Sequence, residues 1–480
     1  MRHTPIAIAA GLSLALACTT AFSADMTVRF ATFNASLNRD LSGQLLSDLG
    51  NPLATGLTGT AANRIQQAHN VAEIVQRLNA DVLLVNEFDF DLAGMPTASS
   101  QAMALGYSSQ AAQRFQDNFL AASHGNAVRG FTSGLAYAHR YTPNTNTGLA
   151  SGFDLNNNGV VAGGDDAWGF GNFGGQFGFT VYSRHEIVAV RSFQNFKWKD
   201  MPGNLLTNDP VAGTNNLANF YSTDEIANLR LSSKNHVDVT VRINGRDVHF
   251  LTAHPTPPTF DGAEDRNGKR NHDEIRLWAD YIAGASYLYD DQGGTGGLAP
   301  GARFVIAGDY NADPLDGDSF KGVVNGTAYN AINQLLGNPL VNTTLTPGAP
   351  GGLDAKDHPS NNGNANQSHV GDPTQDTADF SDFAPGNLRV DYVLPSANLP
   401  MTGAGVFWPA DPDRNAPNTT GDLYDLVGNF RDPNLYANYA SSDHKAVWAD
   451  VTISAVPEPA SYALMLGGAA LLRVLRRRAG

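Results

Sequence analysis

The stretch RFVIAGDYNADP, residues 303–314, begins as an apolar run and then places an acid and an amide directly after that run. Such a short run, with Gly308 and Pro314 at its end, predicts a buried strand followed by a turn. Asp309 and Asn311 therefore stand where a core strand meets a loop, and such positions often carry function. The question is which other residues share that edge.

The segments around this strand alternate between strand and helix patterns. The stretches 28–34 and 81–87 are strand-like, and between them residues 63–80 place apolar side chains at helical spacing. A strand, a helix and a strand in that order predict a mixed α/β layer. Many strands and few helices favour packed sheets that helices cover from outside. Further strands are expected at 180–184, 238–243, 247–254, 303–309, 389–395 and 446–453, with a helix at 272–282.

The composition limits the classes of function. The 480 residues carry 31 basic and 46 acidic side chains, which is a formal net charge of −15. This acidic balance gives no broad basic surface for nucleic acids, so a nucleic-acid substrate would have to be held locally. The single cysteine, Cys18, lies near the N-terminus in a segment that we expect to be removed.

Both ends of the chain have the pattern of targeting segments. Residues 1–24 combine Arg2, an apolar run and small residues, which is typical of a secretory signal peptide. Residues 455–480 contain a Pro-Glu-Pro, a short apolar run and four arginines. The run is shorter than the roughly 20 residues of an ordinary membrane span, and the arginines would stay on the cytoplasmic side. A frayed amphipathic helix is the alternative, but it does not explain the Pro-Glu-Pro.

This tail resembles the PEP-CTERM sorting signal of Gram-negative bacteria. The resemblance implies a transient contact with the inner membrane, cleavage by a sorting peptidase and release to the cell surface or medium. We therefore expect an exported protein that is processed at both ends. Residues 25–454 would form one domain with Gly/Asn-rich loop insertions, and we expect it to be a monomer.

Polar residues recur where the predicted strands end or begin. Each residue alone is typical of a strand-end turn, because Asp and Asn favour turns for local reasons. Together they indicate one site, since loops gathered at one edge of a sheet are where sites are usually built. The set consists of Asn34, Glu87, His254, Asp309, Asn311, Asp391, Asp443 and His444.

These residue types suit metal-assisted hydrolysis of phosphate esters. A hard divalent ion such as Mg2+ takes oxygen ligands and needs only one or two carboxylates from the protein. Glu87 and Asp443 would supply these carboxylates, with the amide oxygen of Asn34 nearby. The ion would neutralise charge on the phosphoryl oxygens and position the attacking water.

The histidines supply the proton chemistry that such a reaction needs. A histidine beside a carboxylate can move a proton or bind a phosphoryl oxygen as imidazolium, which suits His444 backed by Asp391. His254 would serve the leaving group or a non-bridging oxygen.

Five short motifs carry a resemblance to a known family. Their order is similar to that of the endonuclease/exonuclease/phosphatase superfamily, the deoxyribonuclease-I-like fold, over nearly the whole exported region. One departure is Asn86, where many members have Gln. The motifs are FN at 33–34, NE at 86–87, GDYNADP at 308–314, RVDYV at 389–393 and SSDHKAV at 441–447.

The resemblance implies both a fold and a set of roles. The fold is a four-layer α/β/β/α sandwich with one active site at the top of two packed mixed sheets. Glu87 would be the main ligand of Mg2+ or Mn2+, with Asp443 near the metal. Asp309 and Asn311 would orient the nucleophile and the phosphate. Asp391 would orient His444.

Two further stretches each have a functional and an ordinary interpretation. Arg266 and Arg270 lie just after the His254 segment, and their guanidinium forks match phosphate oxygens; the alternative is a solvated helix start. Residues 154–165 have the spacing of a calcium loop, although the Gly-rich flanks are not helical. The alternative there is an Asx-rich surface loop. The predicted Ca2+ ligands are Asp154, Asn156, Asn158 and Asp165.

Two classes of function follow from these patterns. The first is an exported phosphodiesterase or phosphatase whose substrate is DNA, RNA, a phospholipid head group or a small phosphate ester. The second is a non-catalytic cell-surface or matrix protein that reuses the fold, as the sorting tail and the Gly/Asn-rich loops suggest. The complete set of acids, amides and histidines favours the enzyme.

Overall fold

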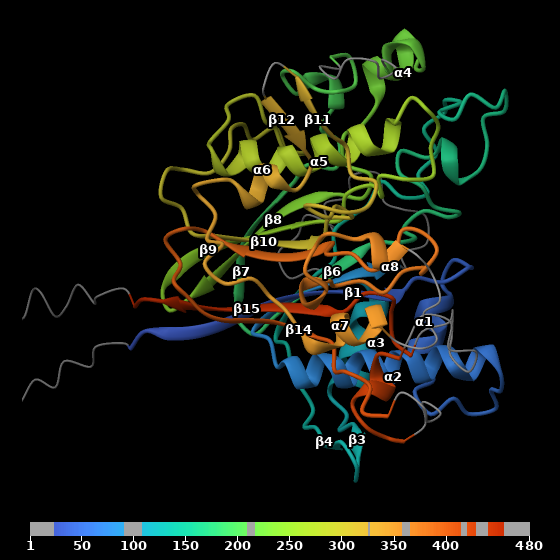
Figure 1. The fold of residues 1–480 in the computed structure, drawn as a ribbon, viewed down its shortest axis with the longest axis vertical. Coiled ribbons are helices and arrows are strands. Elements are labelled where there is room, and N and C mark those ends of the chain that lie inside the picture. Colours follow the sequence, from blue (N-terminus) through green and yellow to red (C-terminus); the bar gives the residue numbers. More distant parts are fainter. Residues whose placement is uncertain are drawn as a thin grey trace, which may run out of the picture.

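The computed structural model describes residues 24–90, 108–208, 217–324, 327–357, 365–413, 420–428 and 440–455. The predicted signal peptide and sorting tail lie outside the described residues, apart from one residue of each. Two mixed β-sheets packed face to face form the centre of the molecule (Figure 1).

The first sheet has six strands in the order β14-β15-β1-β2-β6-β5. β1 runs parallel to β2 and antiparallel to β15. Apart from Met26 at its start, its apolar residues are buried because both faces of the sheet are covered. The strands are β1 (Met26–Leu37), β2 (Val82–Phe88), β5 (His139–Tyr141), β6 (Phe179–Ser183), β14 (Met401–Phe407) and β15 (Ala446–Ile453).

The second sheet has five strands in the order β13-β10-β9-β8-β7. β10, which holds the opening stretch of the sequence analysis, runs parallel to β9 and antiparallel to β13. All six residues of β10 are buried, as the apolar run predicts. The strands are β7 (Glu186–Ser192), β8 (His236–Ile243), β9 (Arg246–Ala253), β10 (Phe304–Asp309) and β13 (Asp391–Pro395).

The two sheets share one hydrophobic core. Phe30 of β1 and Phe250 of β9 are fully buried between them, with ring centroids 5.6 Å apart. Full burial of one such side chain stabilises the fold by about 1.5–3 kcal/mol. This packing fixes one sheet on the other and thereby brings their edges together.

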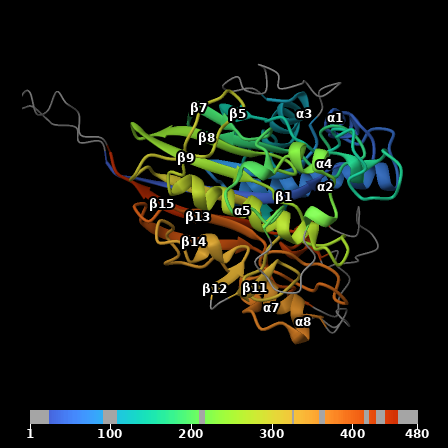
Figure 2. The same cartoon turned by 90° about the horizontal axis from the view of Figure 1, so that it is seen from above.

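A helix covers the outer face of each sheet (Figures 1 and 2). α2 (Thr60–Leu78) packs on the first sheet, and the apolar positions predicted for it, Ile65, Ala68, Ala72 and Val75, are buried. α5 (Arg266–Ile282) packs on the second sheet. It begins at Arg266 rather than at residue 272, because its polar first turns are also buried against the protein. The predicted α/β/β/α sandwich is confirmed.

Smaller elements lie outside these layers. Among the described residues they include three short α-helices on the later half of the chain, α6, α7 and α8, and two small hairpins. Among the described residues, no helix combines the length and apolar character needed to cross a membrane. The elements are α1 (Gln44–Leu49), α3 (Gln110–Phe115), η1 (Gln116–Leu120), β3 (Gly125–Asn126), β4 (Gly130–Phe131), η2 (Gly164–Asp166), η3 (Trp198–Asp200), η4 (Leu217–Asn219), α4 (Thr223–Asn228), β11 (Lys321–Val324), β12 (Thr327–Asn330), α6 (Asn333–Leu336), α7 (Pro350–Asp357), α8 (Ala365–Ser368), η5 (Pro373–Gln375) and η6 (Tyr424–Leu426).

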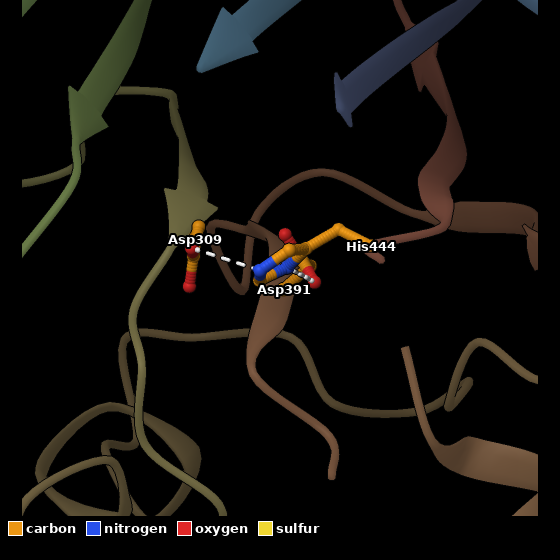
Figure 3. Close-up of side chains that lie close together, drawn as sticks. All are labelled: Asp309, Asp391 and His444. Carbon is orange, nitrogen blue, oxygen red and sulfur yellow. Dashed lines mark hydrogen bonds and ion pairs between the residues drawn. The ribbon is translucent and has the colours of Figure 1, made fainter. Parts of the chain in front are cut away.

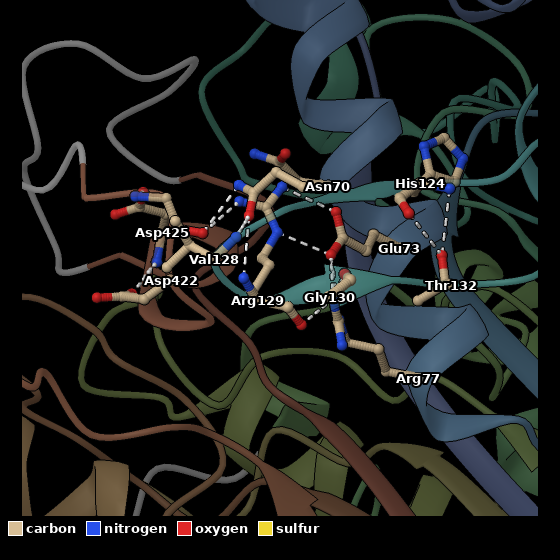
Figure 4. Close-up of polar contacts among 12 residues, drawn as sticks. Asn70, Glu73, Arg77, His124, Val128, Arg129, Gly130, Thr132, Asp422 and Asp425 are labelled. Atoms are coloured by element: carbon tan, nitrogen blue, oxygen red, sulfur yellow. Dashed lines mark hydrogen bonds and ion pairs between the residues drawn. The ribbon is translucent and has the colours of Figure 1, made fainter.

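A polar network attaches the hairpin β3–β4 to α2 (Figure 4). The Glu73 carboxylate of α2 accepts from Arg77 at 2.6 Å and from Arg129 of the hairpin at 2.8 Å. Arg129 also donates to the carbonyl of Gly421 at 3.2 Å. The network therefore joins three segments that are far apart in the sequence.

Candidate active site

The predicted site residues gather at one edge of the two sheets. β1 and β2 end there, as do β9 and β10, because the strands of each pair are parallel. β13 and β15 are antiparallel to these strands and begin at the same edge. Asp309 pairs directly with Asp391 in the ladder between β10 and β13. Residues from six strands therefore meet at this edge.

One carboxylate oxygen is the centre of the site. Asp309 Oδ2 accepts from Asn34 Nδ2 at 3.0 Å and lies 3.3 Å from His254 Nε2 and 3.6 Å from His444 Nε2. The other oxygen, Oδ1, accepts the backbone N–H of Asn311 at 2.8 Å. Burial opposes the charge of Asp309, but the two histidines and Asn34 outweigh it and hold the pKa of this carboxyl below its usual range. Asp309 is therefore a buried and ionised carboxylate.

His444 lies between two aspartates (Figure 3). Its Nδ1 is 2.9 Å from Asp391 Oδ2, and its Nε2 faces Asp309. Burial opposes a charge on the ring, yet Asp391 and Asp309 raise the pKa of His444 well above its usual value. The ring is therefore held as an imidazolium with one N–H directed at the site.

Among the described residues, one group of three acidic or histidine side chains is close enough to share a metal ion. It consists of Asp309, Asp391 and His444, and all three are buried. Hydrogen bonding between His444 and Asp391 already accounts for part of this closeness.

Glu87 and Asp443 lie beside the Asp309 centre. Burial and then the charge of Asp443 raise the pKa of Glu87 to about 7, although His444 and a hydrogen bond to Asn34 act in the opposite direction. Glu87 also has a φ of +54°, which is uncommon for a residue with a side chain and is typical of functional sites. Glu87 and Asp443 therefore lie close together, and the positive charge of His444 does not fully offset their repulsion.

The amide of Asn34 has a different contact from the one expected of a metal ligand. Its Nδ2 donates to Asp309 and its Oδ1 accepts the N–H of Ser36 at 3.2 Å. One lone pair of that oxygen is still available, so its role as a ligand stays a prediction. Asn311 has a φ of +50° and donates through Nδ2 to the carbonyl of Pro255 at 3.2 Å.

His254 is electrostatically unlike His444. It is buried, and burial together with the charge of Lys234 lowers the pKa of His254 to about 4. Its Nδ1 has no hydrogen-bond partner in the described part of the chain. A neutral ring then places its hydrogen on Nε2, facing Asp309. His254 is a neutral donor, whereas His444 is a charged one.

Lys234 is a site residue that the sequence analysis missed. It is buried just before β8, and the charges of Glu274, Asp309 and Glu87 act on it. Burial nevertheless lowers the pKa of the Lys234 amine. The only signal in the sequence is one lysine in SSKNHV immediately before a strand, which does not distinguish it from a surface residue.

The two covering helices position the site through buried polar side chains. On α2, Gln67 Nε2 donates to the carbonyls of Ser36 and Ser441 at 2.9 and 2.8 Å, and thereby holds the segment that leads to His444. On α5, Glu274 accepts the N–H groups of Ser233 and Thr256, both at 2.6 Å. Both helices therefore hold the backbone segments that carry the site residues.

The two arginines predicted as phosphate contacts have other partners. Arg270 is half-buried and donates to the carbonyls of Leu231, Trp168 and Arg230. Arg266 pairs with Glu264. Their contact with a phosphate stays a prediction, and the carbonyl contacts of Arg270 hold that side chain against the protein.

The predicted calcium loop forms a tight turn on the surface. Asp154 accepts the N–H groups of Asn158 and Gly159 at 3.0 and 2.7 Å. Asp165 is exposed, whereas its neighbour Asp166 is buried and accepts the N–H groups of Leu155 and Ala162. Calcium binding by Asp154, Asn156, Asn158 and Asp165 stays a prediction.

Thr377 is a second residue that the sequence analysis missed. Its Oγ1 donates to Asp391 Oδ2 at 2.8 Å and accepts the N–H groups of Val390 and Asp391, both at 2.9 Å. Its carbonyl accepts the N–H of Lys445 at 2.7 Å, next to His444. Thr377 thus holds both members of the His444–Asp391 pair.

We predict that Thr377→Val shifts the pH profile of the enzyme. Burial, more than any other cause, raises the pKa of Asp391 to about 6, and the Thr377 hydroxyl acts against this rise. Asp391 must be ionised to orient His444, so activity falls as the pH drops through this pKa. Without the hydroxyl the pKa of Asp391 rises further, and the acidic limb of kcat against pH should move to higher pH. Thr377→Ser should return the acidic limb to its wild-type position. If Thr377→Val and the wild type had identical pH profiles, the role assigned to Thr377 would be wrong.

The fold and this centre define a class of proteins, the α/β/β/α sandwich hydrolases with a buried acid, amide and histidine centre at the joint edge of two sheets. The profile described as the Endonuclease/Exonuclease/phosphatase family matches residues 31–444, and the chain belongs to that family. No curated protein matches the chain in sequence.

Solved structures of this kind are similar to the chain at low identity. One is an endonuclease/exonuclease/phosphatase from Beutenbergia cavernae, with 16% identity, a TM-score of 0.41 and coverage of 89% of this chain and 72% of that one. A second is sphingomyelinase C from Streptomyces griseocarneus, with 15% identity, a TM-score of 0.39 and coverage of 88% of this chain and 99% of that one. A third is a beta toxin from Staphylococcus aureus with bound magnesium ions, with 13% identity, a TM-score of 0.40 and coverage of 88% of this chain and 99% of that one.

Proposed function

We propose that the chain is a divalent-metal-dependent phosphoesterase that hydrolyses phosphodiester or phosphomonoester bonds by in-line attack of an activated water. The observation that carries the proposal is the convergence of Asn34, His254 and His444 on one oxygen of Asp309. Family membership supports the same class of reaction. The buried and complete set favours the enzyme over a non-catalytic surface protein.

The residues around Glu87 fit a divalent ion. The raised pKa of Glu87 reflects a buried carboxyl beside the charge of Asp443, and a cation would relieve that repulsion. Oxygen ligands from acids and amides suit Mg2+ or Mn2+. Glu87, Asp443 and Asn34 would hold the ion. When bound, it would neutralise phosphoryl charge and favour deprotonation of water.

The protein's own groups divide the remaining work. Asp309 is kept ionised and can orient a water and accept its proton, with its geometry fixed by Asn34 and the N–H of Asn311. His444, held as imidazolium, can donate to a phosphoryl oxygen as negative charge develops there. His254 can donate as a neutral ring, and Lys234 adds positive potential at the same edge.

A panel of phosphate esters tests the proposal. The purified chain is incubated with Mg2+, Mn2+ or Ca2+ and with DNA, RNA, sphingomyelin or other phospholipids, and small mono- and diesters. Hydrolysis of at least one class that Asp309→Asn abolishes supports the proposal. If the wild type turns over none of these substrates with any of the ions, a non-catalytic role is the better account.

We further propose that the protein is exported and released at the cell surface or into the medium. The support is the signal-like segment at 1–24 and the sorting-like tail at 455–480. Transient contact with the inner membrane and cleavage by a sorting peptidase follow from the same tail, and we expect a monomer. Mass spectrometry of protein from the native surface should find mature chains that end near residues 456–459. Chains that still end at Gly480 would contradict this route.

A further inference from the structure

A second group of acids lies apart from the active-site edge, around the turn after β10 and the segment 365–376. Asp376 is the unusual member. Its side chain is only 9% exposed, yet it has neither a hydrogen bond nor an ion pair with any described residue. Neither of its oxygens is among the enclosed side-chain atoms that lack a partner in the described residues, so the carboxylate is open to the cavity that it lines.

The neighbouring acids are already satisfied by N–H groups. Asp316 accepts from Val370 and Gly371 at 3.0 and 2.8 Å. Asp313 accepts the N–H of Arg389 at 2.8 Å, and Asp372 accepts the Thr374 hydroxyl at 2.7 Å. None of these donors is available to Asp376.

Asp376 lines a small cavity that has room for an ion. The cavity holds about 10 Å³, which is enough for roughly one water-sized occupant. Asp316, Asn366 and Lys356 also line it. Lys356 makes no ion pair with Asp376 among the described residues and is the one cation against several acids.

The electrostatics of this cavity favour a cation. Burial and then the charges of Asp313, Asp316 and Asp372 raise the pKa of Asp376 to about 8, while Lys356 opposes this only in part. With this pKa Asp376 is mostly protonated near neutral pH, and its ionisation lowers the free energy of unfolding unless positive charge is added.

We propose that this cavity binds one divalent cation of the calcium type, with the carboxylates of Asp376 and Asp316 as its protein ligands. A calcium site can have only a few carboxylates, because amide or carbonyl oxygens and water complete the coordination shell in irregular geometry. Among the described residues, Asp376 and Asp316 belong to no group of three acidic or histidine side chains whose ligand atoms all lie within 4.8 Å of one another, although His369 also lines the cavity. We therefore expect weak binding, with a Kd of about 10⁻⁴–10⁻³ M, as in extracellular modules.

The site has a consequence for the active centre. Asp376 directly precedes Thr377, which holds Asp391 and the segment of His444. A bound ion would order the stretch 372–376 and so restrain Thr377. The cation is structural, and it stands apart from the ion that we assign to Glu87.

Calcium titration of the full chain tests the site. Saturating Mg2+ keeps the Glu87 site filled, and Asp154→Ala as the parent removes the surface loop from the comparison. Ca2+ should raise the melting temperature of this parent by a few degrees. Asp376→Asn added to the parent should abolish the shift and lower the bound calcium by one equivalent in equilibrium dialysis. Asp318→Asn should change neither, because Asp318 is exposed and does not line the cavity.

Loss of the ion and loss of the fold give different results. In a chelator above about pH 8, Asp376→Asn should melt no lower than its parent, because it removes a buried charge that has no partner. If Asp376→Asn does not fold, Asp316→Asn provides the same comparison. A calcium shift of unchanged size in these variants, or the absence of a shift in the parent, would overturn the proposal.

Discussion

His444→Ala is expected to lower kcat for phosphate ester hydrolysis by about 10²- to 10⁴-fold, a range that covers the loss of a donor to the developing charge and the loss of a positioned proton donor. The ring is buried, is held by Asp391 at 2.9 Å and faces Asp309 Oδ2 at 3.6 Å. Its charge can stabilise a phosphoryl oxygen only in this position. KM should change far less than kcat, because the charge interacts most strongly with the transition state. Steady-state kinetics on the best substrate of the panel measure both.

A second histidine of the same fold provides the control. His249 also pairs with a buried aspartate, Asp238, at 2.8 Å, but it lies in the middle of β9, whereas His254 directly follows the end of that strand. His249→Ala should retain kcat within about threefold, as expected for a site outside the chemistry. If His444→Ala kept near-normal turnover, or if both variants lost activity equally, the assigned role of His444 would be wrong.

Removal of the divalent ion is expected to abolish hydrolysis. An ion that stabilises developing charge contributes several kcal/mol, which corresponds to about 10³-fold or more in rate. Activity should disappear in excess chelator and return with Mg2+ or Mn2+. Glu87→Gln should lose activity and weaken metal binding, because the amide cannot replace the charge of the carboxylate that lies beside Asp443.

The matched substitution Glu186→Gln separates the local effect from a change in net charge. Glu186 is exposed at the start of β7, so this variant should bind metal and turn over substrate as the wild type does. Isothermal titration with Mg2+ distinguishes loss of the ion from loss of the catalytic groups. Undiminished hydrolysis by the wild type in excess chelator would sink the metal mechanism.

Within the two central sheets, the strands that the sequence analysis missed are β5, β7 and β14, and each lies at the edge of its sheet. β14 reads MTGAGVF and β7 reads EIVAVRS. An edge strand has fewer neighbours to pack against, so it needs fewer apolar residues than a central strand. The central strands are detectable because they are buried on both faces and are therefore nearly continuous apolar runs.

The sequence by itself determined the central strands, the two covering helices and the acids, amides and histidines at the strand ends. These features are readable because hydrophobic periodicity and the residue at the end of a run are local properties of the chain. Their meeting at one edge follows from the parallel and antiparallel strand directions, which the structure shows.

Only the tertiary structure decided what surrounds those residues. Lys234 and Thr377 look like ordinary loop residues until packing brings them to Asp309 and Asp391. Likewise, Asp376 becomes a buried carboxylate without a partner only because the segments of Asp313 and Asp316 fold against it. Burial, pKa and hydrogen bonding depend on contacts between residues that are distant in the chain, and no local pattern encodes such contacts. The sequence can therefore name candidate groups for the reaction, but only the packed structure sets their charges and shows which residues hold them in place.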